Sequence, residues 1–317
     1  MEDFLAAQKR SNRAINEAGL RSTDVSCAEA LPKDLGDLQA TIEFVLGPFG
    51  CAKDLSDLSA FDFARSDEQG HDAFCRQGFG AMIEKLAEGL PVQLSTPVTQ
   101  IDFSGRAAVQ VQTAKGTLSA QAVIVTPSPG VLAAGKLKFK PALPARHRDA
   151  IAKLQLGSYD HIALELADNP MGLQSDDLVY EIATSERTAA LLANISGTSL
   201  CFIDVGGRFG RALAAEGETA MIDFAINWLV DLYGTSIKAA IKRRHATQWN
   251  RATWVLGAFA SAAPGNQPAR RVLMESLNNR IWFAGEAVNE NWWGTVGGAW
   301  ESGERAADAV IKRLEQG

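Results

Sequence analysis

The sequence has no long apolar run, few cysteines and few histidines, and each shortage argues against a class of protein. No stretch approaches the roughly 18 consecutive apolar residues that a membrane-spanning helix needs. The cysteines stand far apart with no C-x-x-C pair, which indicates reduced thiols rather than a disulfide framework or a zinc site. The four histidines are equally scattered, so we expect no metal site.

Positive charge is also scarce. The chain carries 31 Lys and Arg against 37 Asp and Glu, and its formal net charge is -6. Nucleic-acid and anionic-membrane surfaces normally show clustered basic residues, so we expect neither kind of partner. The one dense basic run, AIKRRHA (240–246), is expected at the end of a helix as a solvated face. The N-terminus has a charged helical pattern unlike a signal peptide, and we expect a cytoplasmic protein.

A third shortage is the glycine motif with which a nucleotide-binding fold normally begins, G-x-G-x-x-G between a first strand and a helix. The segment GFGAMI (78–83) starts correctly, but Ile83 stands where the third glycine should be. The segment GGRFGR (206–211) has the wrong spacing and follows a strand without opening a convincing helix. Neither segment is therefore expected to bind phosphate.

What remains fits a mixed α/β protein of 317 residues, 46% hydrophobic and 21% charged. Residues 1 to about 90 are predicted to be helices joined by polar turns, one of which should stop at Gly47-Pro48. Period-two alternation over residues 92–129 predicts a three-stranded antiparallel meander followed by a buried strand at 122–125.

The second half alternates turns, helices and strands. The predicted elements are a helix and a strand within LPARHRDAIAKLQLGSYDHIALEL, the strand SLCFIDVGG, the long helix ETAMIDFAINWLVDLYG, a strand in RRHATQWN, the last strand RIWFAGE and the last helix GGAWESGERAADAVIKRL. This pattern predicts two lobes woven together by several chain crossings.

The closing stretch RIWFAGEAVNENWWGTVGGAWESGERAADAV (280–310) raises a functional hypothesis. An apolar strand runs directly into Gly285-Glu286, and a carboxylate at the carboxyl end of a strand suits the hydroxyls of a ribose or ribityl chain. GTVGGAW then opens a helix, whose unpaired N–H groups favour an anionic or electron-rich partner. The alternative is that the glycines form a turn and the tryptophans lie in the core.

The residues FAGEA…WWGTVGGAWESGERAADAV resemble the C-terminal flavin-binding signature of the FAD-dependent amine oxidases, the monoamine and polyamine oxidase group. Three further stretches are similar to this family in the same order along the chain. They are the helix, hairpin and strand from GFGAMIEKL to VIVTPSPGVL, the turn and helix in LKFKPALPARHRDAIAKL, and QWNRATWVLGAFASAAPG. Together the matches cover roughly residues 75 to 317.

The resemblance implies an α/β (α+β mixed) fold of two interwoven lobes. One lobe would be an incomplete FAD-binding domain and the other a substrate domain with a mixed sheet and helices. The expected division is 1–75 for a helical part of the substrate domain, 76–135 for a helix, β-meander and strand of the FAD domain, 136–270 for the substrate domain, and 271–317 for the C-terminal strand and helix of the FAD domain.

The resemblance also implies cofactor-binding residues. Glu286, preceded by Gly285, matches the family glutamate that binds the ribityl or phosphate portion of FAD. Val296 and Gly297 fall where backbone amides meet the pyrimidine end of the isoalloxazine ring. The remaining positions that the resemblance assigns to the cofactor are Val98 at the adenine and Trp249 and Trp293 near the ring. No cysteine follows Cys201, so the FAD is expected to be non-covalent.

The family chemistry is hydride removal from the carbon next to an uncharged amine nitrogen, with dioxygen reoxidising the flavin to release peroxide. Many members use two aromatic walls facing the flavin. Here Phe259 would be one wall and Thr295 stands at the other. Trp254, Trp292 or Trp293 could replace the lost aromatic surface, or each could be a core residue.

The family lysine that holds a water near the reactive flavin nitrogen is His161 in this chain, next to Asp160. A histidine with a carboxylate neighbour could hold water or move a proton near neutral pH. Alternatively, His161 is satisfied by a local backbone carbonyl. The expected catalytic residues are therefore His161, Phe259 and Thr295, acting on a small-molecule amine.

The largest departure from the family is at the beginning of the chain. Family members place a Rossmann unit with its glycine motif before the segment where this chain starts, and those amides neutralise the pyrophosphate. We expect the unit to come from a partner chain or an upstream segment. Two alternatives stay open: a flavoenzyme with other chemistry (desaturase, isomerase or monooxygenase), and a non-catalytic subunit or remnant.

Overall fold

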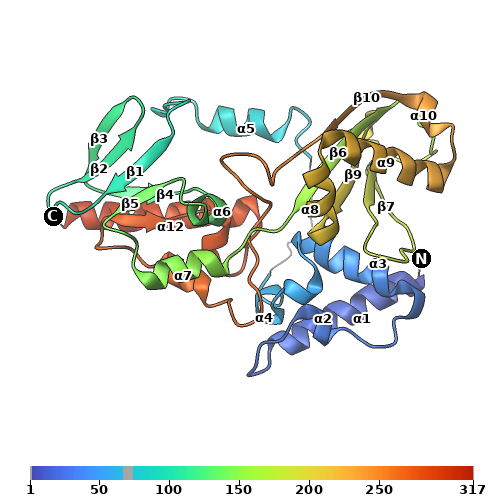
Figure 1. The fold of residues 1–317 in the computed structure, drawn as a ribbon, viewed down its shortest axis with the longest axis horizontal. Helices are drawn as coiled ribbons and strands as arrows, with labels where there is room; N and C mark the ends of the chain where they lie inside the picture. The colour runs from blue at the N-terminus through green and yellow to red at the C-terminus, as the bar shows by residue number, and fades with distance from the viewer. Residues whose placement is uncertain (1, 67–73, 317) are drawn as a thin grey trace.

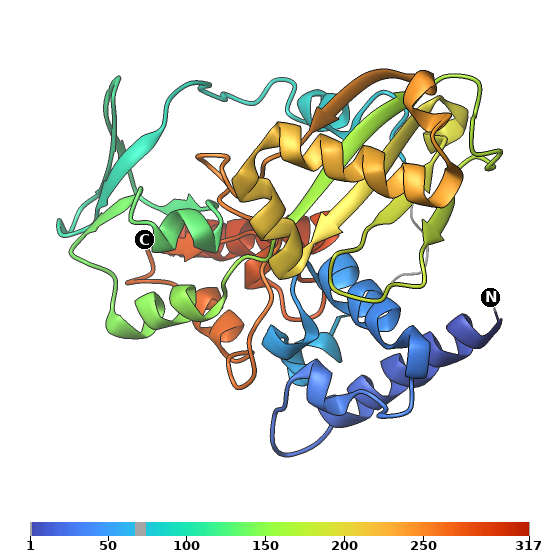
Figure 2. The same ribbon diagram turned by 45° about the vertical axis from the view of Figure 1, so that its right-hand side comes forward.

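The computed structural model describes residues 2–66 and 74–316, and it confirms the mixed α/β fold. Two lobes lie side by side in Figure 1, one around a five-stranded sheet and one around a four-stranded and a two-stranded sheet. A group of helices from the N-terminal part lies below the five-stranded lobe in both ribbon views (Figures 1 and 2).

The N-terminal helices pack around their own apolar core. They are α1 (Glu2–Gly19), α2 (Cys27–Ala30), α3 (Gln39–Phe44) and α4 (Ala60–Phe63). Ile15, Ile42 and Leu58 are fully buried among them. The predicted stop at Gly47-Pro48 is wrong, because the helix continues through the proline as a π-helix, Val45–Phe49. A proline lacks the N–H that an ordinary helical turn needs, and the wider turn accommodates it.

The predicted β-meander is confirmed. It consists of β1 (Val98–Asp102), β2 (Val109–Thr113) and β3 (Gly116–Ala120), which pair antiparallel in sequence order. A short strand that the sequence did not predict, β5 (Lys138–Lys140), pairs parallel with β1. The four strands form one sheet in the order β3-β2-β1-β5.

Beside this sheet lie two parallel strands, β4 (Val123–Val125) and β11 (Ile281–Phe283), paired Val123 to Ile281. Both were predicted. The helices of this lobe are α6 (Pro129–Ala133), α7 (Ala145–Lys153), α11 (Ala269–Met274) and α12 (Val296–Glu315). Residues of α7 and α11 share one core with β11, so the lobe is built from segments far apart in the chain. The division of the chain into domains stays a prediction.

Helix α5 (Phe79–Leu86) forms as predicted but packs poorly. None of its residues is buried. Its apolar side chains Met82, Ile83 and Leu86 are 40%, 42% and 55% exposed. Figure 1 shows it at the top of the molecule, above the junction of the two lobes. Its apolar side chains therefore form an uncovered surface.

The second lobe is an antiparallel sheet in the order β10-β6-β9-β8-β7. Its strands are β10 (Ile241–Ala246), β6 (Tyr159–Leu166), β9 (Leu200–Gly206), β8 (Ala190–Ala193) and β7 (Asp177–Tyr180). One face is covered by α8 (Gly207–Glu216) and α9 (Glu218–Tyr233), next to the short α10 (Ile237–Ala240). Ile162, Leu164 and Ile203 are fully buried there.

Two sequence predictions fail in this lobe, the first only in part. The basic run AIKRRHA begins at the last residue of α10, Ala240, but its basic side chains lie on β10, an edge strand, where they are exposed as predicted. Exposed charged side chains suit such an edge because they discourage pairing with other chains. The segment GGRFGR does open a helix, α8, but the Arg208 N–H donates to Asp54 Oδ2 at 2.9 Å. The Asp54 carboxylate therefore uses an amide at the start of α8 that a bound phosphate would need.

Among residues 2–66 and 74–316, no helix is both long and apolar enough to cross a membrane. In the same residues, no group of three or more His, Cys, Asp or Glu side chains could hold a metal ion.

Candidate functional site

The parallel strands β4 and β11 end at the same edge of their sheet. Thr126 follows β4, and Gly285 and Glu286 follow β11. Gly285 has φ of +134°, and a Cβ placed on it would lie 3.9 Å from the carbonyl oxygen of Thr126. Ligands of parallel sheets gather at the carboxyl ends of the strands, particularly where backbone can be approached closely.

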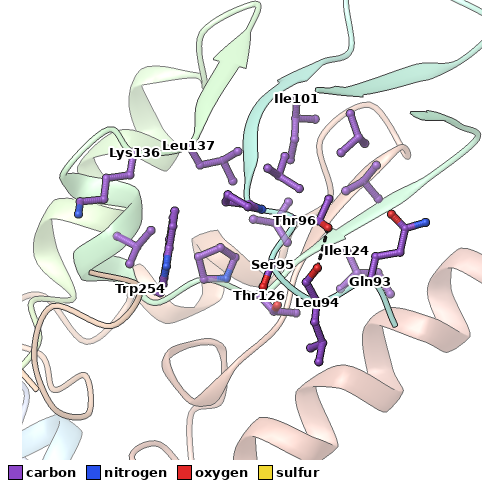
Figure 3. Close-up of a pocket in the computed structure, with 17 residues that line it drawn as sticks. Gln93, Leu94, Ser95, Thr96, Ile101, Ile124, Thr126, Lys136, Leu137 and Trp254 are labelled. Atoms are coloured by element: carbon purple, nitrogen blue, oxygen red, sulfur yellow. Dashed lines mark hydrogen bonds between the residues drawn. The ribbon is translucent and has the colours of Figure 1, made fainter. Parts of the chain in front are cut away.

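A cleft of about 600 Å³ runs along β4, within the size range of small-molecule sites. In Figure 3, Trp254 and Lys136 lie on one side of the cleft, and Leu94 and Ile124 lie on the other. The predicted adenine contact Val98 lines this cleft. Among the residues that the structure describes, Lys136 is the only charged one that lines the cleft, so these residues offer little charge for an anionic ligand.

Glu286 fixes two loops at the end of β11. Its Oε1 accepts the Ala260 N–H at 2.9 Å, and its Oε2 accepts the Gly294 N–H at 2.9 Å. Burial raises the pKa of Glu286, and the charge of Arg270 and the two N–H donors oppose this rise. The carboxylate therefore brings Ala260 and Gly294 to the edge where β4 and β11 end. A contact with a ribityl chain stays a prediction.

Helix α12 starts at this edge with an open end. Thr295 is its N-cap, and its Oγ1 accepts the Gly298 N–H at 2.9 Å while donating to the Trp292 carbonyl at 2.8 Å. Thr295, Val296 and Gly297 are all exposed. No described residue accepts a hydrogen bond from the amides of Val296 and Gly297. These free amides and the positive end of the helix dipole favour an electron-rich partner.

The corner rests on a buried ion pair that no sequence pattern predicted. Arg270 and Asp62 are both 0% exposed and joined by two hydrogen bonds of 2.8 and 2.7 Å. Trp293 lies in the same core, since its Nε1–H donates to the Asp62 carbonyl and Arg270 stands 5.1 Å over its ring. Trp293 is 4% exposed. Its ring therefore supports the loop before α12 from behind.

The expected neighbour of His161, Asp160, turns to the opposite face of β6. Its carboxylate accepts hydrogen bonds from the Thr247 hydroxyl and from the Trp249 N–H, both at 2.9 Å. Burial raises the pKa of Asp160, while these donors oppose the rise. Asp160 thereby fixes the loop that carries Trp249, whose side chain is 42% exposed.

His161 pairs instead with Asp204 on the adjacent strand β9. Its Nδ1 lies 2.6 Å from Asp204 Oδ1, and the Tyr159 hydroxyl donates to Asp204 Oδ2 at 2.9 Å. The Tyr159 ring lies 6.2 Å from that of Phe259, and a Cβ on Gly294 would lie 3.2 Å from Phe259. A chain of contacts thus leads from the loop before α12 to His161.

The structure therefore brings several predicted residues to one corner, where β4 and β11 end and α12 begins: Gly285, Glu286, Phe259, Thr295, Val296 and Gly297. Val98 lies in the cleft alongside β4. Trp249 and His161 come from the five-stranded lobe. The cluster of His161 with Asp204 and Tyr159 could not be predicted from the sequence, because 43 residues separate Asp204 from His161 and no local pattern marks the pairing.

A family model described as flavin containing amine oxidoreductase matches residues 27–311, so the chain belongs to this family. The resemblance drawn from the sequence is thereby confirmed. The description of the family names a flavin, which agrees with the FAD predicted from the sequence. The free amides of Val296 and Gly297, at the carboxyl ends of two parallel strands, fit the flavin end of this cofactor. The single charged residue of the cleft, Lys136, does not by itself match its two phosphates.

Particular relatives differ in length from this chain. Lysine-specific histone demethylase 2 of Homo sapiens is 26% identical over 310 residues, covering 93% of this chain and 36% of that protein. Polyamine oxidase 4 of Oryza sativa subsp. japonica is 27% identical over 243 residues, covering 75% of this chain and 48% of that protein. The chain thus spans less than half the length of these relatives.

Among solved structures, the cyclohexylamine oxidase from Brevibacterium oxydans IH-35A has the same fold. Its TM-score is 0.75 at 20% sequence identity, and the likeness covers 99% of this chain and 76% of that one.

Proposed function

We propose that this chain provides the substrate-binding lobe and the flavin-facing corner of an FAD-dependent oxidoreductase that oxidises a C–N bond of an amine or amino acid. The observation that carries the proposal is the open start of α12, where two unpaired amides lie at the carboxyl ends of β4 and β11. Membership of the flavin-containing family supports the same assignment.

When bound, FAD supplies the electron chemistry, taking a hydride from the carbon next to the amine nitrogen and passing electrons to dioxygen to give peroxide. The amides of Val296 and Gly297 would favour the electron-rich edge of the cofactor. Phe259 and Tyr159 would form an apolar wall that excludes water and favours the neutral amine. Thr295 would keep the amide-bearing turn in place through its cap. His161 would hold water or move a proton.

We also propose that FAD is held jointly with a dinucleotide-binding unit, supplied by a partner chain or by another segment of the same polypeptide. β4 pairs with only one strand among the described residues, and the cleft runs along it. The uncovered apolar side chains of α5 offer a second contact area. Such a unit would add backbone amides for the pyrophosphate, which Lys136 alone does not neutralise.

The test is the visible absorbance of the purified chain with added FAD, with and without a co-expressed dinucleotide-binding unit. Flavin bands that bleach when an amine is added without oxygen, followed by peroxide when air enters, would support the proposal. Flavin bands with no response to amines would favour a desaturase, isomerase or monooxygenase. A protein that stays colourless under every condition would favour a non-catalytic subunit.

The substrate is proposed only as a small-molecule amine. The names of the relatives mention a histone lysine demethylase, a polyamine oxidase and a cyclohexylamine oxidase, which share an amine and little else. A cytoplasmic location likewise stays a prediction.

A further inference from the structure

Tyr159, His161 and Asp204 form a hydrogen-bonded cluster on one face of the five-stranded sheet. His161 and Asp204 stand directly opposite each other in the β6–β9 pairing. Alternation along β6 places Tyr159 and His161 on the face away from α8 and α9, because Ile162 and Leu164 fill the covered face. The cluster therefore faces the side on which Phe259 and the loop before α12 lie.

The hydrogen bonds of the cluster determine which ring nitrogen of His161 carries the proton. The side chain of Asp204 is 5% exposed, and its two oxygens are used by Tyr159 and by His161 Nδ1. With Asp204 ionised, Nδ1 must carry the proton, as in other carboxylate-bound histidines. The other ring nitrogen, Nε2, then keeps a lone pair. It has no hydrogen-bond partner among the described residues, and 37% of the His161 side chain is exposed.

We propose that Asp204 is a positioning residue that makes His161 the base for the substrate ammonium group. The proposal rests on the proposed amine oxidation, since only the neutral amine can lose hydride from its neighbouring carbon. In the step, the lone pair of His161 Nε2 forms a new N–H bond. One N–H bond of the ammonium breaks, and its electron pair stays on the amine nitrogen. The resulting imidazolium is paired with the carboxylate of Asp204.

The charges around His161 suit this role. Burial by itself lowers the pKa of His161, but the hydrogen bond and charge of Asp204 and the charge of Asp160 outweigh it, so the pKa is raised. From the β10 side, the hydroxyl oxygen of Thr247 accepts the backbone N–H of His161 at 3.0 Å, and this bond does not involve the ring. The nearest titratable side chain on β10, His245, is paired with Glu218 instead. A raised pKa lessens the cost of taking a proton from an ammonium group.

The first test needs no flavin. Nuclear magnetic resonance of the ring nitrogens of the 317-residue chain reports both the tautomer and the pKa of His161. We expect the neutral ring to carry its proton on Nδ1 and to titrate above the usual value of about 6.5. In Asp204→Asn, the pKa should fall by about one unit or more. The control Glu165→Gln removes a carboxylate that lies on the same strand and pairs with Arg243. It should leave the pKa of His161 unchanged.

A neutral ring protonated on Nε2, or a pKa unchanged in Asp204→Asn, would overturn the inference and leave the proposed flavin chemistry untouched. Near-ultraviolet circular dichroism checks that Asp204→Asn folds. If it does not, Tyr159→Phe provides the second test. Loss of the Tyr159 hydroxyl removes a hydrogen bond that stabilises the Asp204 carboxylate, so that within the cluster the carboxylate interacts with His161 alone. The pKa of His161 should therefore rise. An unchanged value would count against the cluster.

A separate test uses the flavin-loaded protein. The acid limb of kcat/KM against pH reports the base in the free enzyme. In Asp204→Asn this limb should move to lower pH by the shift seen in the resonance titration, while Glu165→Gln keeps the parental limb. A merely structural role for Asp204 would lower the rate without moving the limb, and that result would refute the assignment.

Discussion

The buried pair of Arg270 and Asp62 allows a quantitative prediction about the corner that it supports. Arg270→Met would remove the two hydrogen bonds to Asp62 and leave that carboxylate buried without a counter-charge. It would also remove the donors to the carbonyls of Ala287 and Ala260, at 3.1 and 3.0 Å. Breaking one side of a buried ion pair typically costs 3–5 kcal/mol. We therefore expect a loss of about 4 kcal/mol in the free energy of unfolding.

The double variant Arg270→Met, Asp62→Leu removes both charges together. It leaves three backbone groups without their partners, the carbonyls of Ala287 and Ala260 and the N–H of Ala262. The Asp62 carboxylate is no longer left buried without a counter-charge, although Glu286 still loses the nearby charge of Arg270. The loss should therefore be smaller than the sum of the two single losses, by at least about 2 kcal/mol.

The assay is urea unfolding followed by tryptophan fluorescence. The matched control is Arg146→Met, which breaks a two-bond pair with Glu275 that is 62% and 46% exposed. This control should lose less than about 1 kcal/mol. The reasoning is refuted if Arg270→Met costs no more than the control, or if the double variant loses the full sum.

Three further predictions concern single residues. Glu286→Ala should weaken flavin retention, because the amides of Ala260 and Gly294 lose their acceptor; retention equal to the parent's would remove Glu286 from the site. Burial lowers the pKa of His147, so its contribution to stability is present above pH about 6.5 and is lost as pH falls. His147→Leu should lose less stability than the parent between pH 7.5 and 5.5 in urea titrations, and an equal loss would contradict this. Cys75 is the one half-exposed thiol among the four cysteines, so Ellman's reagent should find one fast thiol in the native chain and none in Cys75→Ser; a fast thiol that survives the substitution would contradict the burial of the other three.

Local periodicity was enough to predict most individual elements. The alternation over residues 92–129 predicted the meander, whose strands place buried residues such as Ile101 and Val109 among exposed or half-buried ones. It gave no sign of β5, a strand of only three residues that depends on its pairing with β1. It also misplaced AIKRRHA, since charged residues suit an exposed helix end and an exposed edge strand equally well.

Some residues of the site could likewise be predicted from local sequence, and others could not. Gly285, Glu286 and the start of α12 could be placed from the sequence because they are neighbours along the chain. Asp204 could not, since its contact with His161 depends on the register of two strands. The buried pair of Arg270 and Asp62, 208 residues apart, was invisible for the same reason.

The most direct test of the flavin-binding corner is a difference-absorbance titration of FAD into the parent chain and into Val296→Pro. Val296 is the first residue of α12, where proline lacks only an amide that is unpaired in any case, and Thr295 already has the extended conformation that precedes proline. We predict that Val296→Pro keeps its stability and binds FAD about 5- to 10-fold more weakly, the loss of one hydrogen bond. Equal affinity in the two proteins, or no flavin signal in the parent even with the dinucleotide-binding unit co-expressed, would contradict the account.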